Sequence, residues 1–189
     1  MELRKLILKN RSFRRFDESH DISEACLREL VDLGRLSPSG ANLQPLKYML
    51  SYEADMNARV FPHLQWAGYL LDWDGPAPGE RPSAYIVVLR DANIRMAGGC
   101  DHGIAAHSIL LGASERGLGG CMIGSIHRVE LSQALGLGPG CEILLVLALG
   151  KPAETVVLEP AGTDGDIQYW RDSRGVHHVP KRPLDEVIV

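Results

Sequence analysis

The sequence lacks the patterns that mark a metal site or a set of disulfides. It contains four cysteines, which are Cys26, Cys100, Cys121 and Cys141. None belongs to a CxxC pair, and their spacings match no zinc pattern. His102 and His107 lie five residues apart on an expected helix, so they do not share a face, and His177 and His178 are adjacent. We therefore expect buried free thiols and no metal ligands.

Long apolar runs and an excess of positive charge are also missing. The longest strongly apolar stretch, residues 143–149, is far shorter than the roughly 20 residues of a membrane-spanning helix. The first ten residues lack the uninterrupted apolar core of a signal peptide. The formal net charge of −4 argues against a nucleic-acid surface. We expect one cytoplasmic domain over residues 1–189, with neither membrane nor nucleic acid as a partner.

The hydrophobic pattern predicts helices and strands in mixed order. The expected helices are residues 3–9, a segment from a capping box at Asp21 and Glu24 to just before Pro38, and residues 55–64, 101–116 and 129–135. The expected strands are residues 47–51, 84–89 and 142–149, and residues 72–82 read as a surface loop. This mixture indicates an α+β or α/β domain.

Two segments point to a larger assembly. The helix expected at 101–116 is apolar or small on most sides, so it should be buried on most sides. The rest of the chain has little left to cover it, which leaves a second subunit or a larger domain. The tail, residues 152–189, is charged and has no sustained period, yet it ends in an apolar run at 184–189. We hypothesise that the tail is an extended arm that wraps a partner subunit.

Two segments near the N-terminus carry groups that suit a ligand. Residues 11–16 hold three arginines and Ser12, and guanidinium groups bind phosphate through paired hydrogen bonds. Residues 37–45 hold Asn42 and Gln44, whose amides suit the edge of a heteroaromatic ring. The alternatives are a solvated basic turn for the first segment and an ordinary helix-to-strand loop for the second.

Two later segments are also candidates. The glycines of residues 117–124 would let a ligand approach the backbone closely. This is not a dinucleotide fingerprint, because it follows a helix, and the alternative is a helix cap before a buried strand. Residues 179–184 place Lys181 and Arg182 between prolines, and the alternative there is a solvated charged tail.

In this order and spacing, the four segments resemble the nitroreductase-like family of FMN-dependent oxidoreductases. The matching motifs are Arg11-Ser12-x-Arg14 with Phe16, Pro38-Ser39-x-x-Asn42-x-Gln44-Pro45, residues 101–124 with the exit Gly117-Leu118-Gly119, and Lys181-Arg182-Pro183-Leu184. The chain departs at Asn10, where many members have another basic residue, and at Leu46, where many have Trp. The resemblance implies an α+β fold with a central mixed sheet flanked by helices.

The resemblance also implies an FMN site at the interface of an obligate homodimer. The implied cofactor-binding residues are Arg11, Ser12, Arg14, Pro38, Ser39, Gly40, Asn42, Gln44, Met122, Ile123, Gly124, Lys181 and Arg182. Arg11 and Ser12 would lie at the phosphate and ribityl side, and Arg14 at the N1 and O2 edge of the ring. The loop around Asn42 would bond the pyrimidine edge or ribityl hydroxyls. The backbone N–H of Gly124 would face N5, and the other subunit's Lys181-Arg182 segment would complete the phosphate clamp.

The implied reaction is ping-pong. NADH or NADPH would give hydride to flavin N5, and a small flat acceptor such as a nitroaromatic or quinone would then be reduced; no catalytic side chain is required. Residues 66–69 either line the acceptor pocket or belong to the core. Three other functions stay open: a specialised or flavin-fragmenting reductase on the same scaffold, a non-catalytic FMN-binding protein such as a redox sensor or flavin store, and a structural dimer without cofactor.

Overall fold

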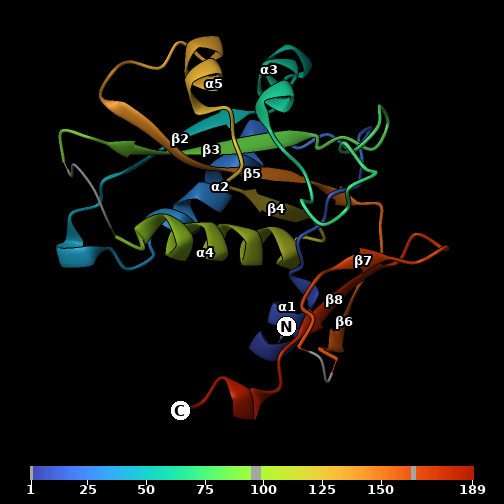
Figure 1. Ribbon diagram of the computed structural model, residues 1–189. Coiled ribbons are helices and arrows are strands. Elements are labelled where there is room, and N and C mark those ends of the chain that lie inside the picture. The colour runs from blue at the N-terminus through green and yellow to red at the C-terminus, as the bar shows by residue number, and fades with distance from the viewer. Residues whose placement is uncertain (1, 95–98, 163–164) are drawn as a thin grey trace.

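A computed structural model describes residues 2–94, 99–162 and 165–189 of the chain (Figure 1). The elements in chain order are α1 (Leu3–Lys9), β1 (Phe16–Asp17), α2 (Glu24–Arg35), η1 (Gly40–Asn42), β2 (Leu46–Ser51), α3 (Ala54–Val60), η2 (Phe61–His63), β3 (Ala84–Asp91), α4 (Asp101–Glu115), β4 (Gly119–Ile123), α5 (Arg128–Ala134), β5 (Cys141–Pro152), β6 (Val156–Pro160), β7 (Trp170–Arg171), β8 (His177–Lys181) and η3 (Leu184–Glu186). The α+β fold expected from the sequence is confirmed.

A five-stranded sheet forms the centre of the molecule, in the order β1-β5-β3-β2, with β4 also paired to β5. These strands pair antiparallel, and a parallel bridge joins Ser12 to Gly120 next to β4. Helices α2 and α4 cover one face of the sheet, and α3 and α5 cover the other (Figure 1). The edges of the sheet are therefore β2 on one side and β4 with β1 on the other.

The two central strands explain why their sequences are apolar without interruption. Successive side chains of a strand point to opposite faces of the sheet. Ile86 and Val88 of β3 pack toward α2 and α4, whereas Tyr85 and Val87 pack toward α3 and α5. All four are almost completely buried. A strand that is covered on both faces has no polar positions, which is why residues 84–89 were predictable as a strand.

Helix α4 has one exposed stripe. Ala105, Ala106 and Ile109 are buried against the sheet and α2, while Gly103, Ile104 and His107 are exposed. The expectation of burial on most sides is thus met within a single chain, except along this stripe. A 15-residue helix is about 22 Å long, so the exposed stripe runs across a large part of the molecule.

Several local predictions need correction. Helix α2 begins at Glu24 and its N-cap is Ser23, whose hydroxyl accepts the N–H of Cys26 at 3.2 Å, so the capping box at Asp21 is wrong. The helix expected at 55–64 ends at Val60, and a 3-10 turn with a proline in its first turn follows. Of the four thiols only that of Cys121 is buried, and Cys100 is exposed.

The sequence predicts neither metal ligands nor a membrane-spanning helix. Among the described residues, His, Cys, Asp and Glu side chains form no group of three or more that could hold a metal ion. The described helices are also too short or too polar to cross a membrane.

The tail folds into a small second sheet that projects from the main body (Figure 1). β6 pairs parallel with β8, and β7 pairs antiparallel with the other side of β8. These strands are two to five residues long, which is too short for a sequence period to reveal them. Beyond β8, the apolar side chains of Leu184, Val187 and Ile188 are exposed.

Candidate functional site

A groove of about 390 Å³ opens beside β4, at one edge of the main sheet. Its wall combines Arg14, two loop segments and one residue of the tail: the lining residues are Arg14, Gln65, Trp66, Ala67, Gly68, Cys121, Met122, Ile123, Gly124, Ser125 and Tyr169. Arg14, Met122, Ile123 and Gly124 were predicted together as ligand-binding residues, and the structure brings these four to one groove.

The backbone at Arg14 is held by a buried carboxylate. The N–H of Arg14 and the N–H of Arg15 both donate to Glu154, the second at 3.1 Å. The side chain of Glu154 is 2% exposed, and its other oxygen accepts from Arg171 at 3.0 Å. The parallel bridge between Ser12 and Gly120 ties the same segment to β4. Three independent contacts thus fix the segment from which Arg14 projects.

The guanidinium of Arg14 is also fixed. Its Nη1 lies 3.2 Å from Nε2 of His177 and donates to the carbonyl of Ser12 at 3.3 Å. The guanidinium carbon lies 4.8 Å from the centre of the Tyr169 ring, a cation–π contact. His177 and Tyr169 both come from the tail, so the tail forms the wall beside Arg14.

His177 is neutral at this position. Its side chain is completely buried, and this burial, together with the nearby charges of Arg14 and Arg171, lowers the pKa of His177 to about 4. Arginine can only donate hydrogen bonds, so Nε2 of His177 accepts and the ring proton lies on Nδ1.

The opposite wall of the groove is braced by Arg128. Its Nη2 donates to the carbonyls of Gly124 at 3.0 Å and Leu144 at 3.2 Å, and its Nε donates to Ile143 at 3.1 Å. One side chain thereby ties the end of β4 to β5. Space beside Gly124 is open, since no heavy atom lies within 4 Å of the point where a Cβ would stand. A ligand can therefore reach the backbone at Gly124 closely.

Residues 66–69 belong to both the core and the groove. Trp66 and Ala67 are buried and also line the groove. Tyr69 is about half exposed and packs on Tyr169, with ring centres 4.8 Å apart. Trp66 and Ala67 therefore belong to the core, and a role of this segment in an acceptor pocket stays a prediction.

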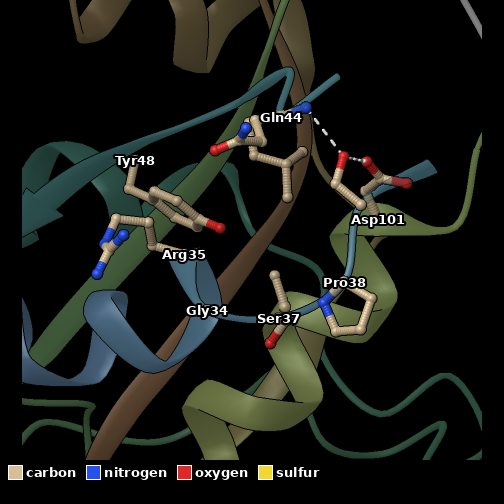
Figure 2. Close-up of a pocket in the computed structure, with 10 residues that line it drawn as sticks. Gly34, Arg35, Ser37, Pro38, Gln44, Tyr48 and Asp101 are labelled. Carbon is tan, nitrogen blue, oxygen red and sulfur yellow. Dashed lines mark hydrogen bonds between the residues drawn. The ribbon is translucent and has the colours of Figure 1, made fainter. Parts of the chain in front are cut away.

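The loop around Ser39 lies elsewhere, at the start of β2 and the N-terminal end of α4. It borders a separate pocket of about 150 Å³ (Figure 2). The hydroxyl of Ser39 donates to Asp101 at 2.6 Å and accepts the N–H of Gln44 at 2.9 Å. Gln44 and Asn42 both have left-handed backbone angles, with φ near 50°. Such angles are costly for side chains other than glycine and gather at functional sites.

Two predicted groups of residues are thus separate within one chain. The loop with Pro38, Gly40 and Asn42 adjoins β2, whereas Gly124 follows β4 at the other edge of the sheet. Three strand spacings separate these edges, which is about 14 Å. Pro38, Gly40 and Asn42 are exposed.

The remaining predicted residues do not line the groove. Nε of Arg11 is buried without a hydrogen-bond partner among the described residues, and its Nη2 donates to the carbonyl of Ile7 at 2.6 Å. Ser12 is exposed. Lys181 ends β8, the strand that begins at His177, and Arg182 pairs with Glu186 at 3.3 Å.

Sequence reasoning missed four residues that build this groove, namely Arg128, Glu154, Tyr169 and His177. His177 was weighed only as a metal ligand. No local pattern marks Glu154 or Arg128, because each acts on backbone groups that lie far away or on another strand. Tyr169 lies in the tail, whose sequence has no sustained period.

Comparison with known proteins agrees with this architecture. The model of a family described as the nitroreductase family matches residues 7–151. A nitroreductase family protein from Clostridium difficile 630 superposes with a TM-score of 0.71 at 17% identity, over 100% of this chain and 98% of the other.

Two further solved structures are similar. A protein described as a nitroreductase in complex with FMN, from Exiguobacterium sibiricum 255-15, gives a TM-score of 0.68 at 16% identity, over 82% of this chain and 90% of the other. One described as an NADH dehydrogenase/NAD(P)H nitroreductase, from Parabacteroides distasonis ATCC 8503, gives 0.66 at 18% identity, over 89% and 96%. A comparison with curated protein sequences gave no match.

Proposed function

Because the chain belongs to the nitroreductase family, we propose that it is an FMN-dependent oxidoreductase that takes electrons from NADH or NADPH and reduces a small flat acceptor such as a nitroaromatic or quinone. One observation carries the proposal: a fixed cation at Arg14 and open backbone at Gly124 face one groove. The FMN complex of the similar Exiguobacterium protein supports the choice of cofactor.

The residues of the groove suit FMN. The buried Nε of Arg11, which has no hydrogen-bond partner among the described residues, and the exposed hydroxyl of Ser12 suit the phosphate and ribityl end. Arg14 would lie at the N1 and O2 edge of the ring, and the backbone of residues 122–124 would lie against the ring near N5. When bound, the isoalloxazine carries the electron chemistry, in a ping-pong cycle, while the protein binds and orients it.

We further propose that two protomers complete each site. The loop with Asn42 and the groove with Arg14 lie at opposite edges of one chain, so a second copy is needed to bring such a loop to such a groove. The exposed stripe of α4 and the projecting arm with Lys181 and Arg182 supply surface for the contact. In a dimer with two-fold symmetry the exchange is reciprocal and yields two equal sites.

Complementation tests the shared site. Arg14→Ala and Asn42→Ala each damage every site in their own homodimers. If one site draws these residues from different protomers, random mixing makes half of the dimers heterodimers with one intact site, which restores about a quarter of the wild-type flavin content. If both residues serve the same site from one protomer, each site of the heterodimer lacks one of them, so no intact site forms and the mixture should recover no flavin binding.

The double variant gives an independent check with the opposite expectation. A protomer that carries both substitutions is mixed with wild type. With shared sites, both sites of the heterodimer are damaged, whereas with unshared sites one stays intact. Heterodimers purified by two different affinity tags should therefore bind almost no FMN. One FMN per purified heterodimer would refute the shared site.

The reaction itself is tested by anaerobic titration. The absorbance spectrum of the purified protein, supplied with FMN if colourless, should show flavin bands that bleach when NADH or NADPH is added. Reoxidation by a quinone or nitroaromatic completes the cycle. Bands that persist would indicate a non-catalytic FMN-binding protein. No flavin uptake at all would indicate a structural dimer and overturn the proposal. The cytoplasmic location stays a prediction.

A further inference from the structure

We propose that His177 is a positioning residue for Arg14: its imidazole accepts a hydrogen bond from the guanidinium, holds this cation toward the groove, and so favours binding of reduced over oxidised FMN. The inference rests on the proposed function, since it concerns the same site. It adds a residue of the tail, 163 positions from Arg14 in the sequence, to the residues that govern the cofactor.

The contacts leave the guanidinium little freedom. A guanidinium presents its donors in one rigid plane, so two hydrogen bonds from the same nitrogen fix that plane. Nη1 of Arg14 points to both Nε2 of His177 and the carbonyl of Ser12. The Tyr169 ring lies against the guanidinium and also packs against His177, with ring centres 5.2 Å apart.

The position requires a neutral acceptor. His177 pairs with Arg171 in the β7–β8 ladder, and its N–H donates to the carbonyl of Thr155 at 2.9 Å, so its backbone is held on both sides. Arg14, Arg171 and His178 surround it with positive or protonatable groups. A positively charged side chain here, such as a protonated imidazole, would repel Arg14, and an apolar one would leave Nη1 without this partner.

Holding the cation in place has a consequence for the cofactor. A two-electron reduced flavin carries more negative charge at its N1 and O2 edge than the oxidised form. A cation fixed beside that edge therefore binds the reduced form more tightly. A mobile arginine, solvated in the groove, would discriminate less between the two forms.

The first test needs no flavin. In the apoprotein, ¹⁵N NMR of the histidine rings should show His177 as the Nδ1–H tautomer at neutral pH, because Nε2 accepts from Arg14. In the Arg14→Gln variant, the ring of His177 should no longer be restricted to the Nδ1–H tautomer. An Nε2–H tautomer or a protonated ring in the wild type would overturn the proposal, whatever the cofactor does.

The second test compares oxidised and reduced FMN. His177→Phe keeps a ring without an acceptor, and His177→Gln keeps an acceptor without the ring. We expect His177→Phe to lose about tenfold of the preference for reduced flavin, which lowers the midpoint potential by about 30 mV for a two-electron couple. His177→Gln should retain most of the preference, and His178→Phe serves as the neighbouring control.

The outcomes separate the two proposals. A wild-type protein that binds no FMN overturns the proposed function and the tuning together. A wild-type protein that binds FMN, with equal potentials in the wild type and His177→Phe, overturns the role of His177 alone. An equal decrease of the flavin midpoint potential in His177→Phe and His177→Gln would indicate that His177 acts through packing, and would also overturn its role as a hydrogen-bond acceptor.

Discussion

The carboxylate of Glu154 should be among the strongest single contributors to stability in this chain, and Glu154→Gln tests this at nearly constant volume. In the wild type this side chain is 2% exposed and accepts from two backbone N–H groups and from Arg171, which is itself only 12% exposed. The amide of a glutamine can still accept through its oxygen. Its NH2 group, however, would face the guanidinium of Arg171, donor against donor.

The expected cost follows from this geometry. Removing one partner of a buried ion pair leaves a buried charge without compensation, which typically costs about 3–5 kcal/mol. A matched control is available in Glu29→Gln, because Glu29 and Arg116 pair at the same 3.0 Å but with side chains 65% and 34% exposed. Exposed pairs contribute about 1 kcal/mol or less, so the control should be close to wild type.

The assay is urea unfolding followed by far-UV circular dichroism, with all variants at one protein concentration because the apparent stability of the proposed dimer depends on it. We expect Glu154→Gln to lower the free energy of unfolding by at least about 2 kcal/mol more than Glu29→Gln does. A difference below about 1 kcal/mol would refute the argument from burial.

Three further predictions follow from particular contacts. Arg14→Gln should weaken FMN binding, and unchanged flavin content by absorbance would contradict its placement at the cofactor. Gly120→Ala puts a Cβ 2.6 Å from the carbonyl oxygen of Ala148 and should cost about 1–3 kcal/mol in urea unfolding, whereas Gly138→Ala, with open space, should not. In the unfolded chain His177 binds a proton as the pH falls below about 6.5, whereas in the folded protein it does so only near pH 4. The free energy of unfolding should therefore fall as the pH is lowered from about 6.5 to about 4. His177→Gln should reduce the dependence of the free energy of unfolding on pH. An equal slope in this variant and the wild type would contradict the assignment to His177.

The main sheet could be predicted from sequence because its signals are local. Residues 84–89 and 143–149 are apolar without interruption since both faces of β3 and β5 are covered. Helix α4 was recognisable from its length and from the Gly117 that follows it. The start of α2 was misplaced by a competing cap, because Asp21 and Ser23 both suit an N-cap and only the structure distinguishes them.

The groove could be predicted only in part. Arg14 and Gly124 lie in recognisable motifs, but the residues that fix them do not. Glu154 is 140 positions from Arg14, and no periodicity links residues at such a distance. Ser39 shows a different difficulty: its motif predicts a contact with the cofactor, yet in this structure its hydroxyl donates to Asp101 and accepts the N–H of Gln44 within the loop.

The contact between Arg14 and the tail also sets an order of events during synthesis. A ribosome adds roughly 5–20 residues per second, so His177 follows Arg14 by roughly 10–30 s. The main sheet and Glu154 are complete in the chain before then, while the arginine-rich segment still lacks its imidazole. The nascent protein therefore passes through a stage with a formed core and an unfinished groove. Cofactor capture should begin only once the last few dozen residues have left the ribosome.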